Sequence, residues 1–437
     1  MTQLRFLPGL GLLLALITTT APAQTAKPHP PLSEAAPETV GMSSQRLARI
    51  DAVVNEYVTA GKQANVGVLI ARNGKIVYHK TFGQDDAATK TPLRRDAIFR
   101  IASQTKAITS MAAMMLVEEG KFLLDEPVSK YIPAFKTMTV LDKFDPKDSS
   151  YTSVPAKSPI TIRQLFTHTS GLDYPGIGSK SMTAIYAKNK IPSGIGTPGG
   201  TLAEAMNRLA KLPLVHQPGE KWTYGLSVDL LGYLVEVVSG QPLDQFLQTR
   251  LFAPLGMNDT YFYLPAAKHN RLAHLFTEDT ARMARPYPTG RPGLSADYPN
   301  FGPKEGTYFS GGAGLSSTMT DYAIFLQMLL NKGEYNGQRI LGPMTVKLIL
   351  TNQIGELNVG QNKFGLGFAL TSAKSAARMP VPEGTFDWGG FFGTTYWADP
   401  EQGIIGLIYT QKFPNSHGDL ADKFKVLVYQ AITEENP

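Results

Sequence analysis

Residues 99–106 read Phe-Arg-Ile-Ala-Ser-Gln-Thr-Lys and hold the most informative pattern of this 437-residue chain. Ser103 and Lys106 form its single Ser-x-x-Lys spacing, at the start of an apolar segment that ends at Gly120. The segment is typical of a helix with a glycine stop. Residues three apart on a helix share a face, and a helix N-terminus offers free N–H groups and a positive dipole end. The pattern fits a nucleophilic serine beside an amine that can take its proton, but taken alone it fits better a serine that caps the helix, followed by a solvated lysine.

Composition removes several classes of protein. The chain has no cysteine and seven histidines, which excludes disulfides, thiol nucleophiles and zinc fingers. Hydrophobic residues make up 43% and charged residues 18%, as expected for a globular protein. The net charge is +6, and the basic residues are scattered along the chain, with Arg94-Arg95 as their longest run. We therefore expect no nucleic-acid partner.

The sequence contains no convincing motif for a cofactor or a metal site. Residues 194–199 match G-x-G-x-x-G, but Pro198 interrupts them and no strand precedes them. The chain has neither a P-loop nor an H-E-x-x-H pair. We therefore expect no cofactor and no metal ion.

The N-terminus matches a secretory signal. One arginine precedes the apolar residues 6–17, and Ala21-Pro22-Ala23 places small residues where a signal peptidase cleaves. The apolar run is shorter than the roughly 18 residues of a membrane span. We expect a signal peptide over residues 1–23, a Pro- and Ala-rich linker over 24–40, and an exported protein, periplasmic or secreted, without a membrane span in the mature chain.

Strand patterns cluster at the two ends of the chain, and helix patterns lie between them. A helix after Ser44 precedes a hairpin whose turn is Asn73-Gly74, and four more strand patterns fall within residues 365–409. We expect an α+β fold for residues 41–437, with an antiparallel sheet built from both ends. The α/β part would cover about 41–100 and 310–437, and a mostly helical insertion about 101–309. A functional cleft is expected between them.

A histidine-based triad was the main alternative chemistry. His168, within Thr-His-Thr-Ser-Gly at residues 167–171, is the most attractive candidate base. However, no serine of the chain lies in the G-x-S-x-G turn that a nucleophile elbow needs. A structural histidine at a helix end is the favoured interpretation.

Several motifs in order resemble the superfamily of serine β-lactamases, penicillin-binding proteins and family VIII carboxylesterases. They are residues 99–106, 165–172, 218–224 and 312–318, and the similarity spans about residues 40–430. The resemblance implies a β-lactamase-like fold, with Ser103 as the nucleophile and Lys106 and Tyr224 as proton-transfer groups. Leu226 stands where class C β-lactamases have an amide-binding asparagine, which argues against β-lactam and peptide substrates.

A third motif of the superfamily, normally Lys-Thr-Gly or His-Thr-Gly, is replaced by Trp388-Gly389-Gly390, as in family VIII carboxylesterases. A tryptophan offers an apolar face and one N–H donor, so it does not recognise a substrate carboxylate. The glycines allow close approach of backbone to substrate. The resemblance places the oxyanion hole at the backbone N–H groups of Ser103 and Phe391. Residues 173–200 hold many Gly, Ser and Pro and are expected to form a long surface loop, which together with Tyr174 would act as a lid. Contact with the substrate is expected from Trp388, Gly389, Gly390, Leu226 and Tyr174.

These observations predict a cofactor-free serine hydrolase that cleaves carboxylic esters through an acyl-enzyme on Ser103. Two alternatives remain. The same chemistry could serve a β-lactamase or a D-amino-acid peptidase or transpeptidase acting on cell-wall peptides. In the second alternative, the protein keeps the fold but is a non-catalytic, penicillin-binding-like sensor. The oligomeric state is not predicted.

Overall fold

The structure is a computed structural model that describes residues 1, 29–86, 88–288, 294, 297–302 and 304–436. The predicted signal peptide lies almost wholly outside these residues. Within them, no helix is both long and apolar enough to span a membrane.

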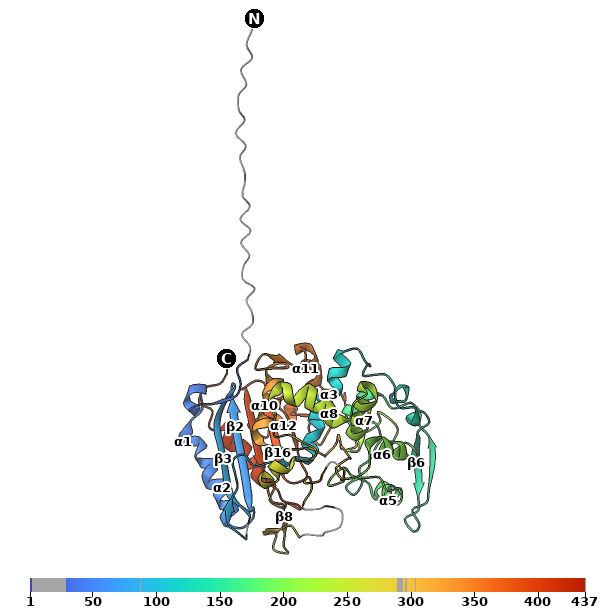
Figure 1. Cartoon of the computed structure of the whole chain (residues 1–437), viewed down its shortest axis with the longest axis horizontal. Coiled ribbons are helices and arrows are strands. Elements are labelled where there is room, and N and C mark those ends of the chain that lie inside the picture. The colour runs from blue at the N-terminus through green and yellow to red at the C-terminus, as the bar shows by residue number, and fades with distance from the viewer. Residues whose placement is uncertain (2–28, 87, 289–293, 295–296, 303, 437) are drawn as a thin grey trace.

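A nine-stranded sheet brings the two ends of the chain together (Figure 1). The strand order is β1-β3-β2-β17-β16-β15-β14-β13, and β4 pairs with β3. Neighbouring strands are antiparallel except β1, which lies parallel to β3. The predicted antiparallel sheet from both ends is confirmed. Part of the expected linker is structured, since it contains β1 and the short helix η1.

The strands are β1 Ser33–Glu34, β2 Asn65–Arg72, β3 Lys75–Asp86, β4 Thr91–Pro92, β5 Phe99–Arg100, β6 Thr139–Phe144, β7 Tyr151–Pro155, β8 Phe276–Glu278, β9 Ala284–Pro286, β10 Ser316–Ser317, β11 Glu334–Tyr335, β12 Gln338–Arg339, β13 Lys363–Phe364, β14 Ala369–Leu370, β15 Phe386–Gly389, β16 Thr394–Asp399 and β17 Ile404–Tyr409.

The α-helices are α1 Ser44–Leu47, α2 Arg49–Thr59, α3 Thr105–Glu118, α4 Ile162–Phe166, α5 Lys180–Lys188, α6 Leu202–Leu209, α7 Ser227–Ser239, α8 Leu243–Leu247, α9 Ala253–Leu255, α10 Met319–Leu330, α11 Pro343–Ile349, α12 Ala373–Ala376 and α13 Asp419–Tyr429. Six short helical turns complete them, namely η1 Pro37–Val40, η2 Ala102–Gln104, η3 Val128–Lys130, η4 Pro133–Phe135, η5 Gln248–Phe252 and η6 Ala266–Arg271.

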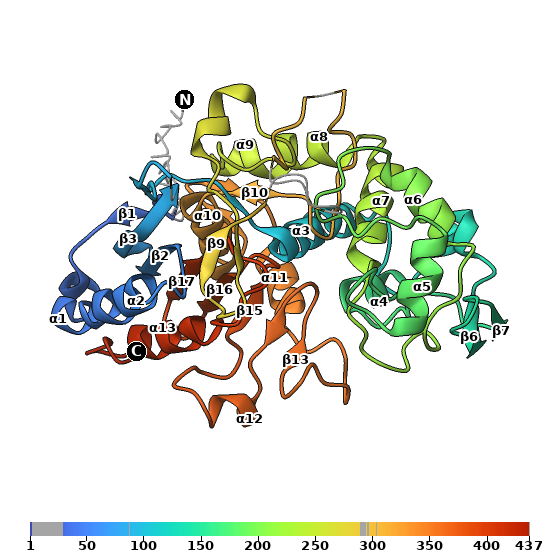
Figure 2. The ribbon, with the colours of Figure 1, turned by 90° about the horizontal axis from the view of Figure 1, so that it is seen from below.

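The sheet separates two hydrophobic cores because strand side chains alternate between its faces. On one face α1, α2 and α13 cover Val68, Ile70 and Ile408. On the other, Leu69, Ala71 and Leu407 join the larger core that includes α3, α7 and α10. Figure 2 shows α3 between the sheet and the helices α4 to α7, with the hairpin β6–β7 at the far end. Ser103, in the turn η2 that leads into α3, therefore lies where the sheet part meets the helical part.

Residues 173–200, expected as a long surface loop, contain the helix α5. Ser179 accepts a hydrogen bond from the Met182 N–H and so caps this helix. Met182, Ile185 and Tyr186 lie on its buried side. The Gly, Ser and Pro content of the flanks concealed this short amphipathic pattern.

Candidate active site

Ser103 lies in the short turn η2, which leads directly into α3. It is 9% exposed, whereas Gln104 and Thr105 beside it are fully buried. Ala102 before it has a left-handed φ of 42°, a conformation that costs a non-glycine residue about 1–2 kcal/mol. Such strain is typical of functional turns. Because Ser103 is at the start of a helix, its N–H belongs to the groups without an intrahelical partner.

Lys106 and Tyr224 both reach the Ser103 hydroxyl. Lys106 Nζ donates a hydrogen bond to Ser103 Oγ at 3.3 Å, as the spacing on one helix face predicts. Tyr224, 121 residues away in sequence, donates from its hydroxyl to the same oxygen at 2.6 Å. Ser103 Oγ therefore contacts two groups that can accept its proton once either has lost its own.

Lys106 is only 2% exposed and is held from three sides. Its Nζ donates to the Gly312 carbonyl at 2.7 Å. It also lies 4.6 Å from the ring centre of Tyr224 and 5.2 Å from that of Tyr174, within the range of cation–π attraction. These contacts fix the amine next to Ser103 with little freedom to swing away.

Tyr224 is positioned by His168, which the sequence offers as a candidate triad base. The His168 carbonyl accepts from the Thr223 N–H at 2.8 Å, and its ring Nδ1 accepts from the Gly225 N–H at 3.3 Å. Its ring centre lies 4.9 Å from that of Tyr224. Burial, together with the Lys106 ammonium, holds the pKa of His168 well below its ordinary value. His168 is thus a neutral structural residue that accepts hydrogen bonds from the backbone N–H groups on both sides of Tyr224.

Aromatic side chains continue the site from Tyr224 to Trp388. Tyr174 stacks on Tyr224 at 5.5 Å between ring centres, with an interplanar angle of 10°. Trp388, half-buried on β15, lies 5.6 Å from Tyr224 and 6.4 Å from Trp222. Phe364 closes the cluster at 5.5 Å from Trp388. The wall beside Ser103 is therefore largely aromatic, and at position 388 it presents an indole in place of a cationic side chain.

Gly389 and Gly390 face different surroundings. A Cβ on Gly390 would lie 2.4 Å from the Ile101 carbonyl and 2.2 Å from Thr394 Oγ1, whereas the nearest atom to a Cβ on Gly389 would be 3.4 Å away. The absence of a side chain at position 390 lets the end of β15 pack against the turn that carries Ser103. The triplet thus brings its backbone beside the nucleophile.

Phe391, which follows the glycines, lies in a small apolar cluster with Ala102, Phe392 and Ile195. Its ring stacks on that of Phe413 with 3.7 Å between centres. Within the described part of the chain, no hydrogen bond engages its backbone N–H. That N–H therefore remains available for the oxyanion role expected of it.

Tyr174 and Leu226, both expected to contact substrate, are 1% and 0% exposed. The Tyr174 hydroxyl donates to the Ser193 carbonyl at 2.8 Å, which ties the segment after α5 to the site. Burial, aided by the Asp229 carboxyl, raises the pKa of Tyr174 far above its ordinary value. Tyr174 thus supports the Tyr224 ring by stacking on it, and contact of either residue with a substrate stays a prediction.

Asp229 is the buried acid that the motif analysis missed. It lies on α7, five residues after Tyr224, and is 0% exposed. Burial raises the pKa of Asp229, whereas the Lys106 charge and hydrogen bonds from Ser310 and Gly312 oppose that rise. The sequence holds one signal of this acid. Residues 228–235 of the helix read Val-Asp-Leu-Leu-Gly-Tyr-Leu-Val, so Asp229 is the single charged residue in a mostly apolar run.

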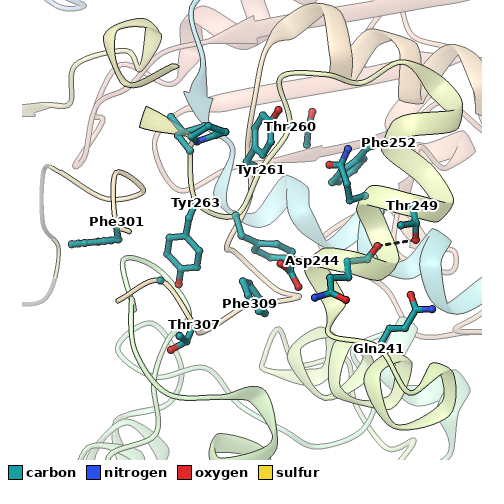
Figure 3. Close-up of a pocket in the computed structure, with 16 residues that line it drawn as sticks. Gln241, Asp244, Thr249, Phe252, Thr260, Tyr261, Tyr263, Phe301, Thr307 and Phe309 are labelled. Carbon is teal, nitrogen blue, oxygen red and sulfur yellow. Dashed lines mark hydrogen bonds between the residues drawn. The ribbon is translucent and has the colours of Figure 1, made fainter. Parts of the chain in front are cut away.

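A cavity of about 800 Å³ lies elsewhere, between α8, residues 260–265 and residues 301–309 (Figure 3). Phe252, Tyr261 and Phe309 give it apolar walls, but its lining does not include Ser103, Lys106 or Tyr224. The hydroxyl of Tyr263 at its edge donates to the Tyr308 carbonyl at 2.8 Å. The lining of this cavity lacks the paired nucleophile and base that acyl transfer needs.

No group of three or more His, Asp or Glu side chains suited to a metal ion occurs among the residues that the structure describes. The side-chain contacts described for Ser103 Oγ come from the Lys106 amine and the Tyr224 phenol.

Comparisons with known proteins identify the family of this chain. The model of the family described as Beta-lactamase matches residues 50–430. Protein Rv1367c of Mycobacterium tuberculosis is 34% identical, over 85% of this chain and 91% of its own length. Esterase EstB of Burkholderia gladioli is 30% identical, over 87% of this chain and 95% of its own.

A solved structure titled EstCE1, a hydrolase with promiscuous acyltransferase activity, superposes with a TM-score of 0.74. It is 29% identical and covers 88% of this chain and 99% of its own. These matches confirm the resemblance and the fold class expected from the motifs.

Proposed function

This chain belongs to the Beta-lactamase family and is a serine hydrolase, and from that premise we propose that it cleaves uncharged carboxylic esters through an acyl-enzyme on Ser103. The observation that carries the proposal is the contact of Tyr224 and Lys106 with one serine oxygen beside Trp388. An apolar wall in place of a cation favours an acyl group without a free carboxylate. Relatives named esterase and hydrolase support this substrate class.

In the proposed reaction Ser103 Oγ attacks the ester carbonyl carbon while its proton passes to Tyr224 or Lys106. The carbonyl oxygen gains the negative charge and takes hydrogen bonds from the N–H groups of Ser103 and Phe391. The C–O bond to the alcohol then breaks, and the alcohol leaves with the transferred proton. Water attacks the acyl-enzyme by the reverse sequence and releases the carboxylic acid.

The test compares wild-type protein with Ser103→Ala on short p-nitrophenyl esters, and follows a fluorophosphonate adduct by intact mass. We expect hydrolysis and one adduct in the wild type, and neither in Ser103→Ala. Ser110→Ala is a matched control, because Ser110 lies buried on the same helix and its hydroxyl has no hydrogen-bond partner in the described structure. Retained esterase activity in Ser103→Ala would refute the proposal.

Two outcomes would favour the alternatives. A much higher kcat/KM for a chromogenic cephalosporin than for the p-nitrophenyl ester would indicate a β-lactam or cell-wall peptide substrate. A protein that forms no adduct with any ester or fluorophosphonate would fit a non-catalytic sensor.

We further propose that the protein is exported and that its signal peptide is cleaved after Ala23. The support is the sequence pattern at residues 1–23. Intact mass of the protein purified from its native host tests this, because cleavage leaves Gln24 as the first residue. A full-length chain found in the cytoplasm would contradict it.

A further inference from the structure

Asp229 is a buried carboxyl group that the acyl-enzyme chemistry described above does not use. Its Oδ1 accepts hydrogen bonds from Ser310 Oγ at 2.6 Å and from the Gly312 N–H at 3.3 Å. Its Oδ2 has no hydrogen-bond partner among the described residues. A fully buried carboxylate with an unpartnered oxygen is costly unless a nearby positive charge compensates. Its position therefore calls for a cation close by.

Gly312 joins this carboxyl group to Lys106. The N–H of Gly312 faces Asp229, and its carbonyl accepts the hydrogen bond from Lys106 Nζ at 2.7 Å. No salt bridge to Lys106 is found in the part of the chain that the structure describes. The charge of Asp229 thus acts on Lys106 through space, across one residue, rather than through a direct ion pair.

The spacing has a chemical advantage. A direct ion pair would direct the amine toward the carboxylate and away from Ser103 Oγ, to which it now donates at 3.3 Å. Gly312 makes the spacing possible, because a Cβ at this position would lie 2.3 Å from Asp229 Oδ2. Thr109, one turn after Lys106, holds the preceding Gly311 carbonyl at 2.8 Å. The α3 helix therefore fixes the glycine pair between the amine and the acid.

The other titratable groups around Lys106 do not supply negative charge. His168 is neutral, since its pKa lies well below the ordinary value. Tyr174, whose ring faces Lys106, has a pKa raised far above 10 by burial. Tyr308, near Asp229, is also kept as a neutral phenol by burial. Tyr224 is the remaining group, and it is the proposed partner in proton transfer. Asp229 is thus the acid that lies across Gly312 from the Lys106 amine.

We propose that Asp229 is a positioning residue that holds Lys106 beside Ser103 through Gly312, and that its charge sets the pH range of the Ser103 reaction. The proposal rests on the Ser103 acyl-enzyme proposed above. Asp229 fixes Gly312, and the carbonyl of Gly312 holds the amine beside the serine. Because a buried negative charge raises the pH at which neighbouring groups release their protons, loss of that charge moves the pH range of the reaction downward.

Asp229→Asn tests the proposal, because it removes the charge and keeps an oxygen that can accept from Ser310 and Gly312. Two rates are measured against pH, namely kcat/KM for a p-nitrophenyl ester and the rate at which a fluorophosphonate labels Ser103. We expect the acid limb of each profile to move to lower pH by about one unit.

Asp321→Asn is the matched control. Asp321 is another buried acid, 5% exposed, which accepts from Thr260 Oγ1 at 2.9 Å and from the Asp259 N–H. Its replacement is expected to lower the Tm while both pH profiles keep their limbs. If Asp229→Asn fails to fold, Ser310→Ala replaces it. Loss of the 2.6 Å hydrogen bond disfavours the ionised carboxyl group, so the limb is expected to move the same way by a smaller amount.

The outcomes are distinct. If the wild-type protein is not labelled at Ser103, the proposed function fails. If it is labelled and both Asp229→Asn and Ser310→Ala keep the wild-type limbs despite a lower Tm, Asp229 is only structural and this inference is overturned. A shift seen equally in Asp321→Asn would also overturn it, because a general loss of stability would then explain the change.

Discussion

Tyr224→Phe separates the chemical role of the tyrosine from its packing role. The change deletes the hydroxyl that donates to Ser103 Oγ at 2.6 Å. It keeps the ring that stacks on Tyr174 at 5.5 Å and faces Lys106 at 4.6 Å. Loss of one hydrogen bond costs about 1 kcal/mol of stability. Loss of a proton-transfer group costs about 100-fold or more in rate, which is about 2.7 kcal/mol in the barrier.

The assay is kcat/KM on a p-nitrophenyl ester, read together with Tm. Tyr429→Phe is the control, because this buried tyrosine donates to Asp399 at 2.8 Å on the opposite face of the sheet. We expect a similarly small loss of Tm in the two variants, and a large loss of activity in Tyr224→Phe alone. Activity of Tyr224→Phe within about threefold of wild type would refute the reasoning, since the removed group would then take no part in proton transfer.

Three further outcomes are expected. The His168 imidazole should show no titration by NMR between pH 5 and 8, because burial and Lys106 keep its pKa well below 6.5; a midpoint in that range would contradict its assignment as neutral. Gly390→Ala should lower the Tm clearly and Gly389→Ala should not, because only the first Cβ would meet the Ile101 carbonyl, at 2.4 Å; equal Tm values would show that the strand shifts freely. Lys412→Met should cost about 3 kcal/mol at pH 7, because it leaves Glu278 buried without its 2.8 Å partner. Burial alone would raise the pKa of Glu278, but Lys412 and Ser416 hold it below its ordinary value, so this stabilisation is present above about pH 4.5 and is lost as the pH falls through the lowered pKa. The Tm difference between Lys412→Met and wild type should therefore shrink in acid, and a difference that stays constant down to pH 3 would argue against the ion pair.

Local sequence signals predicted much of the fold. The amphipathic pattern after Thr318 predicts a helix that ends at Leu330, and α10 covers Met319–Leu330. The turn at Asn73-Gly74 joins β2 to β3 as expected. Such signals succeed because a cap, a glycine stop or a turn depends on residues a few positions apart. The short helix α5 was missed, since its amphipathic pattern spans only nine residues within a Gly- and Pro-rich stretch.

The same distinction between local and long-range contacts applies to the site. Ser103 and Lys106 could be paired from sequence alone, because an i, i+3 spacing on one helix fixes their relation. Tyr224 and Trp388 could be named through motifs, but their distances to Ser103 and to each other depend on how α7 and β15 pack against α3. Asp229 and Gly312 could not be found in this way, since the contact of Gly312 with Lys106 joins residues 206 positions apart. Helix geometry determines which side chains share a turn, whereas only the packing of distant segments places the buried Asp229 across Gly312 from the Lys106 amine.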